Sequence, residues 1–195
     1  NNKIKSVKRV FYTHLHGDQT HGINDLRPFF LNNKKPLPVY ADNRTSKYLL
    51  STFGYCFNST LQYPSILKLN ILKKKHVFKS KNSRILIESI PVRHGKINSV
   101  CYLINRKLAY ASDVDFIFKE SFSLLKNLDF LVIDCLRYSK HPSHFNLDEV
   151  LELVKMISPK NTILTNMHNE LDYKKLKKVL PKNVKPGYDG MCLNL

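Results

Sequence analysis

Short apolar runs alternate with amphipathic stretches along most of the chain. Runs bounded by turn residues are typical of strands, and apolar residues at helical spacing are typical of helices. The pattern predicts strands at residues 7–13, 37–41, 85–92, 99–104, 108–111, 130–136, 162–165 and 191–195. It predicts helices at residues 22–32, from 43 onward, 116–125, 147–157 and 173–180, and an aromatic loop at 54–64. Strands and helices mixed in this way indicate an α/β layered domain.

The whole chain, residues 1–195, is expected to form one domain. Its length is enough to bury a core, and its 43% hydrophobic content is typical of a globular fold. No repeats, low-complexity tracts or linkers divide the sequence. No run approaches the roughly 18 consecutive apolar residues of a transmembrane helix, so we expect no association with a membrane.

The start of the chain and its cysteines bear on its location. It opens with Asn1-Asn2-Lys3, without the apolar segment of a signal peptide and without methionine, which is typical of a processed or truncated start. The four cysteines are scattered and form no Cys-x-x-Cys motif. We therefore expect a cytoplasmic protein with reduced thiols.

The net charge of +17 raises the question of nucleic acid. Lysines outnumber arginines 25 to 7 and are spread along the chain, with local runs only at residues 73–75 and 174–178. Arginine is the residue that specific contacts to bases and phosphates prefer. Nucleic-acid binding is therefore an open alternative that the sequence does not favour, whereas attraction of anionic substrates follows in any case.

One stretch, residues 13–22, concentrates groups that bind metals. His14, His16 and His21 lie within eight residues of one another, with Asp18 between them. Imidazole and carboxylate are ligands that zinc, manganese and iron accept, and the His-x-His alternation suits a chain leaving a strand. Asp18 is also expected to cap a helix that begins at Gly22. The alternative is a capped turn with surface histidines.

Four later stretches end an apolar run in a residue that can bind a metal. These residues are His94, Asp113, Asp134 and His168. Functional groups gather at strand ends because a rigid sheet positions the loops there. A single strand-end histidine is more often structural, but several behind a His-x-His-x-Asp stretch favour a shared site.

The His-x-His-x-Asp stretch resembles the signature of the metallo-β-lactamase superfamily, a group of mostly hydrolytic metalloenzymes. The continuation His-Gly-Ile-Asn-Asp-Leu-Arg-Pro-Phe is similar to the branch that contains the cyclic phosphate phosphodiesterase of phosphonate degradation, and the later strand ends match the later motifs in order. The resemblance implies a four-layer αββα sandwich. Because family members carry strands before the signature, we expect this chain to be the C-terminal portion of a longer protein, lacking those N-terminal strands.

The resemblance also implies two divalent metals per chain, Zn²⁺ or Mn²⁺, that activate a hydroxide. The implied ligands are His14, His16 and His94 for the first metal, Asp18 and His168 for the second, and Asp113 bridging both. The sequence departs from the signature at Gln19, where histidine is usual. Gln19 is a weaker ligand for zinc, and His21 is an alternative, although a supporting role suits it better. Two metals with a weak second site, a single metal, and a different metal preference all stay open.

Residues 141–149 precede a predicted helix, with Asn146 and Glu149 spaced for a capping box. Phosphodiesterases of the superfamily place a proton-donating histidine in this interval, and His144 fits that role better than His141 because it is nearer the helix start. Asp134 is expected to orient His144. Asp18 is also a candidate catalytic residue.

The resemblance therefore implies a phosphodiesterase acting on small cyclic phosphates, such as a ribose or nucleotide cyclic phosphate. One alternative is a tRNA 3′-processing endonuclease of the same fold. Residues 1–195 show no inserted glycine-rich basic module long enough to grip tRNA, and an arm in the missing segment stays open. Another is a non-catalytic metal- or phosphate-binding protein with a degraded second metal site. A homodimer is compatible with the sequence.

Overall fold

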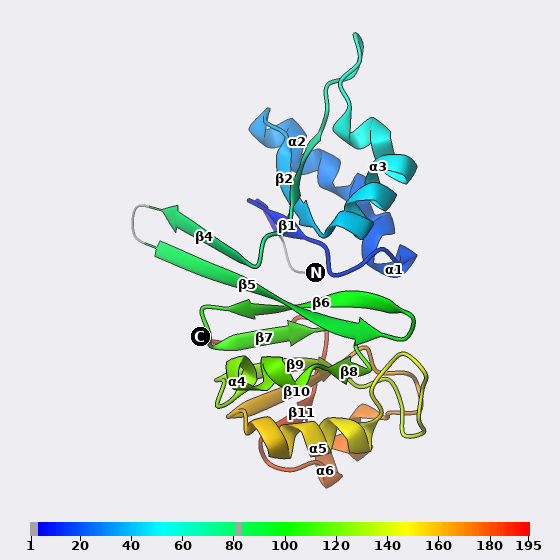
Figure 1. Ribbon diagram of the computed structural model, residues 1–195, viewed down its shortest axis with the longest axis vertical. Helices are drawn as coiled ribbons and strands as arrows, with labels where there is room; N and C mark the ends of the chain where they lie inside the picture. Colours follow the sequence, from blue (N-terminus) through cyan, green and yellow to red (C-terminus); the bar gives the residue numbers. More distant parts are fainter. Residues whose placement is uncertain (1–3, 81–82) are drawn as a thin grey trace. The chain divides into compact units, whose positions relative to one another are not determined.

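The computed structural model describes residues 4–80 and 83–195. The chain forms two compact units, Asn1–Lys73 and Lys74–Leu195, and each is described by itself. The expectation that residues 1–195 act as one domain stays a prediction. Helices and strands alternate in both units, which confirms the predicted α/β class (Figure 1).

The first unit is built on a parallel three-stranded sheet in the order β1-β2-β3. Its elements are β1 (Val10–Phe11), α1 (Gly17–Thr20), the 3₁₀ helix η1 (His21–Leu26), α2 (Arg27–Asn33), β2 (Leu37–Ala41), α3 (Asn43–Phe57) and β3 (Leu67–Ile71). Val39, Leu49 and Leu67 are fully buried in one apolar cluster, so α3 covers the sheet. Asp42 caps α3 by accepting the Thr45 backbone N–H at 2.7 Å.

The second unit is built on an eight-stranded mixed sheet in the order β11-β10-β9-β7-β6-β5-β4, with β8 paired to β5. Its strands are β4 (Lys75–Ser80), β5 (Ser83–His94), β6 (Ile97–Ile104), β7 (Leu108–Ala111), β8 (Phe116–Ile117), β9 (Phe130–Asp134), β10 (Asn161–Thr165) and β11 (Val184–Pro186). Strands β7, β9, β10 and β11 run parallel, so the carboxyl ends of β7, β9 and β10 meet at one edge.

Helices cover one face of this sheet. They are the 3₁₀ helix η2 (Lys119–Ser121), α4 (Phe122–Leu125), α5 (Leu147–Ile157) and α6 (Tyr173–Val179). Leu131 and Ile133 of β9 are fully buried with apolar residues of α4, α5 and α6, whereas Val132 between them lines a cavity. Successive strand residues point to opposite faces, so one sheet carries both the core and a second, more open apolar face.

Several sequence predictions are confirmed. Strands 37–41 and 108–111 and helix 147–157 have the predicted bounds. The capping box is also present: the Asn146 side chain accepts the Glu149 N–H at 2.9 Å, and the Glu149 carboxylate accepts the Asn146 N–H at 3.0 Å.

Other predicted elements were wrong. Residues 22–32 do not form one helix, because Pro28 lacks an N–H and is tolerated only in the first turn of a new helix, α2. The helix predicted at 116–125 does not begin at 116, because Phe116–Ile117 form the strand β8 and Phe116 pairs with Arg93 of β5. The strand predicted at 191–195 is absent among the described residues, and α3 continues into the predicted loop at 54–64. The pattern also missed β3, β4 and β11.

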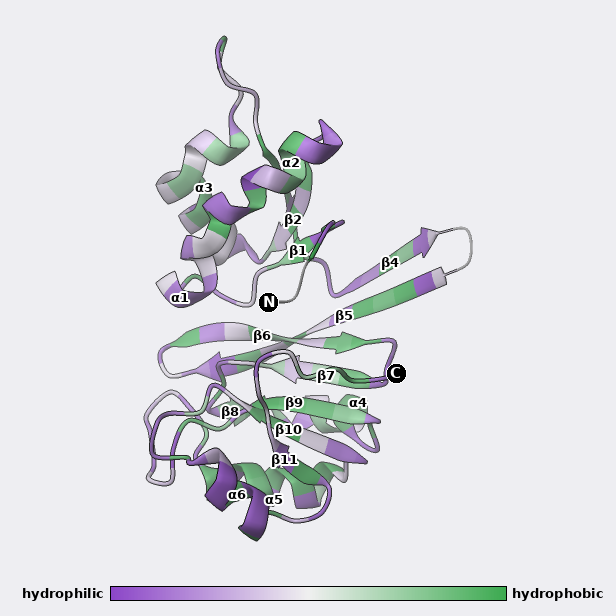
Figure 2. Ribbon diagram, turned by 180° about the vertical axis from the view of Figure 1, so that it is seen from behind, coloured by the Kyte–Doolittle hydropathy of each residue, from purple (hydrophilic) through white to green (hydrophobic). Residues whose placement is uncertain are grey.

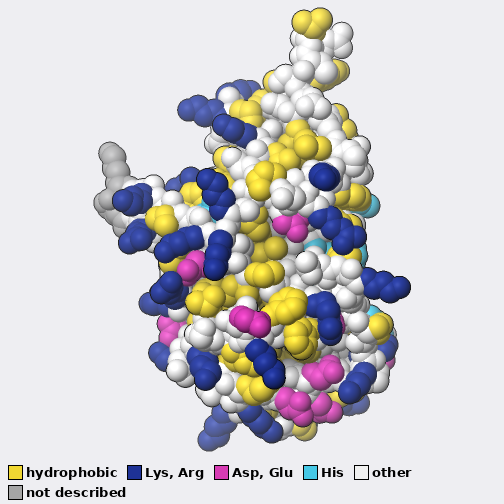
Figure 3. Space-filling model, in the orientation of Figure 1, with side chains coloured by type: hydrophobic (Ala, Val, Ile, Leu, Met, Phe, Trp, Pro, Cys, Tyr) yellow, Lys and Arg dark blue, Asp and Glu magenta, His cyan; other side chains and the backbone are white. Residues whose placement is uncertain are grey.

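The distribution of basic side chains and the length of the helices are relevant to possible binding partners. On the face that Figure 3 shows, lysine and arginine side chains are interspersed with other residue types, as their spacing in the sequence predicts. None of the helices in the described part of the chain is long and apolar enough to cross a membrane.

Candidate active site

In the first unit, the His-x-His alternation places two imidazoles together. His14 follows β1 and is buried, and its Nδ1 lies 3.1 Å from the Thr13 hydroxyl. His16 is exposed at the start of α1. The two rings lie edge to face, with centroids 4.6 Å apart. With Nδ1 of His14 engaged by Thr13, its Nε2 is the atom suited to a metal.

Asp18 lies inside α1 rather than capping a helix, so the predicted cap was wrong. The residue before α1 is His16, and the residue before η1 is Thr20. The Gln19 amide donates a 2.8 Å hydrogen bond to the Asp18 carboxylate. Partial burial favours a higher pKa for Asp18, but the Gln19 amide, a backbone N–H, His14 and His16 outweigh it and lower the pKa. Asp18 is thus held as a carboxylate beside two histidines.

His21 packs α1 against α3. Its Nε2 lies 3.2 Å from the Tyr48 hydroxyl, and its ring meets Phe53 edge-on at 5.7 Å between centroids. A Cβ on Gly17 would come within 3.0 Å of the His21 ring, so glycine lets the two residues approach closely. These contacts favour the supporting role for His21.

In the second unit, His94 ends β5 and is held in one orientation. Its Nδ1 lies 2.6 Å from the Ser143 carbonyl oxygen, which calls for a proton on Nδ1 and leaves Nε2 as the basic nitrogen. Gly95 adopts a positive φ of 60°, and a Cβ there would lie 2.8 Å from Cβ of Ser143. Glycine at 95 therefore permits the close approach that positions His94.

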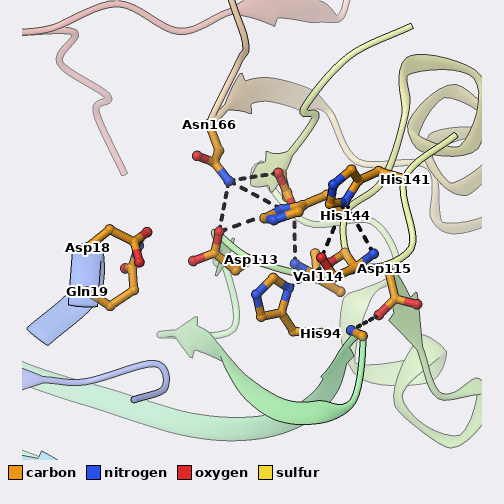
Figure 4. A network of polar contacts seen from close by, with 12 residues as sticks. Asp18, Gln19, His94, Asp113, Val114, Asp115, His141, His144 and Asn166 are labelled. Carbon is orange, nitrogen blue, oxygen red and sulfur yellow. Dashed lines mark hydrogen bonds and ion pairs between the residues drawn. The ribbon is translucent and has the colours of Figure 1, made fainter. Parts of the chain in front are cut away.

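Asp134, which is buried, and His144, which is half-buried, form a pair; Figure 4 shows His144 with its contacts. Asp134 is fully buried at the end of β9 and accepts the Val114 backbone N–H at 3.0 Å. The same carboxylate oxygen, Asp134 Oδ2, lies 2.6 Å from His144 Nδ1. Burial raises the pKa of Asp134 to about 6, although His144 and the Val114 N–H both favour the carboxylate. This is the contact through which Asp134 would orient His144, and the catalytic role of the two residues stays a prediction.

Asp113 adjoins this pair, and Asn166 ties all three together. Asp113 Oδ1 lies 3.7 Å from His144 Nδ1. The Asn166 amide donates to Asp113 at 2.8 Å and to Asp134 at 3.2 Å. Asn166 has a positive φ of 59°, a conformation that asparagine tolerates better than most residues. Sequence reasoning missed Asn166, although its place directly after a strand was a usable signal.

The donor set suits a divalent cation. The ligand atoms of Asp113, Asp134 and His144 lie within 4.8 Å of one another, and carboxylate and imidazole are suitable ligands. A cation bound by both Asp134 and His144 would have to replace their 2.6 Å hydrogen bond. The bond therefore favours Asp113 as the ligand of this group, and Asp134 and His144 as an acid–base pair beside it.

Two further histidines stand apart from these roles. His168 is exposed on the loop after β10, and its Nδ1 lies 3.8 Å from a Glu170 oxygen. It belongs to none of the groups of potential metal ligands found among the described residues. His141 Nδ1 accepts the Ser143 N–H at 3.3 Å, and its ring centroid lies 5.0 Å from that of His144. Burial, together with nearby His144, Arg137 and His94, lowers the pKa of His141. The metal role of His168 stays a prediction from the motif.

The sequence and fold were compared with those of known proteins. The family model described as a beta-lactamase superfamily domain matches residues 1–167. The chain belongs to the metallo-β-lactamase superfamily. A diphosphatase of the PhnP family has a similar crystal structure, with a TM-score of 0.85 and 26% identity over 96% of this chain and 70% of that one. The resemblance found in the sequence and its fold class are thereby confirmed.

Two curated relatives carry different names. An octanoyltransferase of Porphyromonas gingivalis is 27% identical over 96% of this chain and 38% of its own length. A ribonuclease Z of Oceanobacillus iheyensis is 28% identical over 55% of this chain and 34% of its own length. The matches thus span well under half of each curated relative, so neither name carries over to this chain.

Proposed function

We propose that this superfamily member is a metal-dependent hydrolase that cleaves phosphodiesters, with small ribose or nucleotide cyclic phosphates as its substrates. The observation that carries the proposal is the bond between Asp134 and His144 beside Asp113. Hydrolysis of a phosphodiester expels an alkoxide, which is a poor leaving group unless it is protonated. A histidine oriented by a buried carboxylate meets that need.

The tautomer of His144 follows from its partner. With Nδ1 bonded to Asp134, a proton carried on Nε2 is the one available to the departing oxygen. Asp134 favours the protonated imidazole and fixes the plane of the ring, as the carboxylate does in other carboxylate–histidine pairs. Asn166 holds both carboxylates, so Asp113 and Asp134 keep their separation during the reaction.

The proposed metal ligands are those that the family signature assigns. They are His14, His16, Asp18, His94, Asp113 and His168. When bound, divalent cations such as Zn²⁺ or Mn²⁺ acidify water and stabilise the charge that develops on a phosphoryl group. Asp18 contributes a carboxylate that the Gln19 amide keeps ionised, whereas Gln19 itself leaves the second metal position one imidazole short.

A second candidate is an endonuclease that cleaves RNA. The ribonuclease Z relative and the net charge of +17 favour it. A third reading, a non-catalytic binding protein, predicts metal binding without turnover of any phosphodiester.

The proposal is tested by metal content per chain and by turnover of bis(p-nitrophenyl) phosphate and 2′,3′-cyclic nucleotides under added Zn²⁺ and Mn²⁺. We expect His144→Ala to slow the cyclic nucleotides by about 10²–10⁴-fold and the p-nitrophenyl ester far less, since p-nitrophenolate leaves without a proton. His76→Ala, which removes a histidine on β4, serves as the matched control.

The results of this test distinguish a phosphodiesterase from a non-catalytic binding protein. Equal slowing of both substrates by His144→Ala would contradict its role as proton donor. Metal binding with no turnover of either substrate would overturn the enzyme and support the binding protein.

A further inference from the structure

A cavity on the second unit lies away from the groups described so far. Its volume is 470 Å³, and α6, β11 and the segment after β11 supply its walls. The described residues that line it are Tyr173, Lys177, Leu180, Pro181, Lys182, Val184, Lys185, Pro186, Tyr188 and Met191. Its lining therefore combines aromatic rings, aliphatic side chains and lysines.

Two tyrosines give the cavity exposed aromatic faces. Tyr173 is 37% exposed and Tyr188 is 57% exposed. Their ring centroids lie 6.2 Å apart and the ring planes are nearly perpendicular, at 88°. Each ring braces the other, so a flat group that stacks on Tyr188 meets a surface that is already positioned.

The charged residues that line the cavity are all lysines. Lys177, Lys182 and Lys185 line it and are exposed, and α6 carries further exposed lysines at 174 and 178. Among the described residues of the lining, none is acidic. Figure 2 shows α6 as one of the most hydrophilic elements of this unit. Such a site attracts an anion, and the aromatic rings add a surface for a planar group.

The cavity adjoins a second one that reaches the catalytic group. Tyr188 and Met191 also line a cavity of 520 Å³ over β7, β9 and β10, whose lining includes Asn166. Asn166 donates its amide to Asp113. A chain-like ligand lying past Tyr188 would therefore follow a hollowed surface from the lysines to the residues proposed to act on a phosphodiester.

We propose that this tyrosine–lysine cavity binds single-stranded RNA, with a base stacked on Tyr188 and the adjoining phosphates contacted by Lys177, Lys182 and Lys185. Stacking on aromatic rings combined with lysines along the backbone is how proteins hold single strands without reading their sequence. An acidic peptide would use the lysines but has no need of the exposed rings. The inference rests on the second candidate of the proposed function, an endonuclease that cleaves RNA, because it gives such a polymer a binding surface beside the same site.

The test is fluorescence anisotropy of a labelled oligouridylate of about twelve nucleotides, a length within the range that single-strand sites cover. EDTA is present, so binding is measured without metal and without cleavage. We expect Tyr188→Ala to weaken binding about tenfold and Tyr188→Phe to preserve it, since phenylalanine retains the stacking face.

Lysine variants test the charge. The triple substitution Lys177→Ala, Lys182→Ala and Lys185→Ala should weaken binding at least tenfold and reduce the slope of log K against log salt by about 2. The matched control, Lys119→Ala, Lys126→Ala and Lys155→Ala, removes the same charge from exposed positions that line neither cavity. It should weaken binding by less than about threefold.

Three results would overturn the inference: no binding by the wild-type chain, equal weakening by both triple variants, or equal affinity for a duplex of the same length. Its failure is distinguishable from failure of the proposed function. Turnover of a small phosphodiester without oligouridylate binding would overturn this inference alone, whereas oligouridylate binding without any turnover would overturn the hydrolase alone.

Discussion

The two units differ in how their candidate functional residues are spaced along the sequence. In the first unit, His14, His16, Asp18 and Gln19 are neighbours in sequence, and most of them are exposed or half-buried. In the second unit, His94, Asp113, Asp134, His144 and Asn166 come from separate strand ends and loops. Hydrogen bonds link the last four to one another, and another holds His94 to the Ser143 carbonyl. A contiguous motif needs only a short stretch of backbone, whereas a dispersed group depends on the register of a whole sheet.

The carboxylates of the two units show what this difference does to chemistry. Asp18 is exposed, and the Gln19 amide with nearby histidines lowers its pKa. Asp134 is fully buried, and burial raises its pKa to about 6. The first is suited to remain a charged ligand, and the second is suited to share a proton with His144.

The largest expected effect comes from Asp113→Ala. If Asp113 is a metal ligand of the dispersed group, turnover should fall by about 10³-fold or more while the circular dichroism spectrum is unchanged. Asp129→Ala, which removes a half-buried carboxylate paired with Lys160, should leave turnover unaltered. Activity retained within tenfold by Asp113→Ala would show that the second unit does not supply the chemistry.

The second prediction concerns pH and the buried carboxyl. The Asp134 pKa is about 6 in the native state and 3.8 in the unfolded chain, so the native state retains this proton to a higher pH. Below about pH 4 its contribution to stability is fully present, and it is lost as the pH rises through about 6. For the metal-free protein, urea unfolding should show a loss of about 3 kcal/mol over this interval.

Asp134→Asn removes the titrating group, so that loss should disappear in this variant. Asp129→Asn should keep it, because Asp129 is only half-buried and its hydrogen bond with Lys160 lowers its pKa instead of raising it. Wild type and Asp134→Asn with the same pH profile would refute the assignment of the raised pKa to Asp134.

The smallest expected effect tests the contiguous motif. Gln19→His restores the usual imidazole of the family signature and should tighten the weaker metal by about tenfold or more, because imidazole is a better zinc ligand than an amide oxygen. A titration against a chelator measures this. Gln62→His, at an exposed position in the same unit, is the control. If the wild type bound two metals equally tightly, Gln19 would not weaken metal binding at the second position, and the prediction would be contradicted.

Part of the site was predictable because its signals are local. The His-x-His-x-Asp stretch, the strand ends at His94 and Asp113, and the Asn146 capping box are each encoded within a few residues. The role of Asn166 was not predictable in this way, since its amide bridges Asp113 and Asp134 from 53 and 32 positions away. Helix 116–125 failed for the same reason, because pairing of Phe116 with Arg93 overrides the local preference.

The sequence by itself determined the α/β class, the superfamily and the candidate ligands, because apolar periodicity and motif spacing can be recognised without knowledge of the fold. Only the tertiary structure decided that Asp134 is buried against His144, that Gly95 lets Ser143 hold His94, and that Tyr188 links a lysine-lined cavity to Asn166. These features depend on which strands pair and in what register. Strand pairing sets the distance between residues far apart in the chain, and distance and burial set their hydrogen bonds and pKa values.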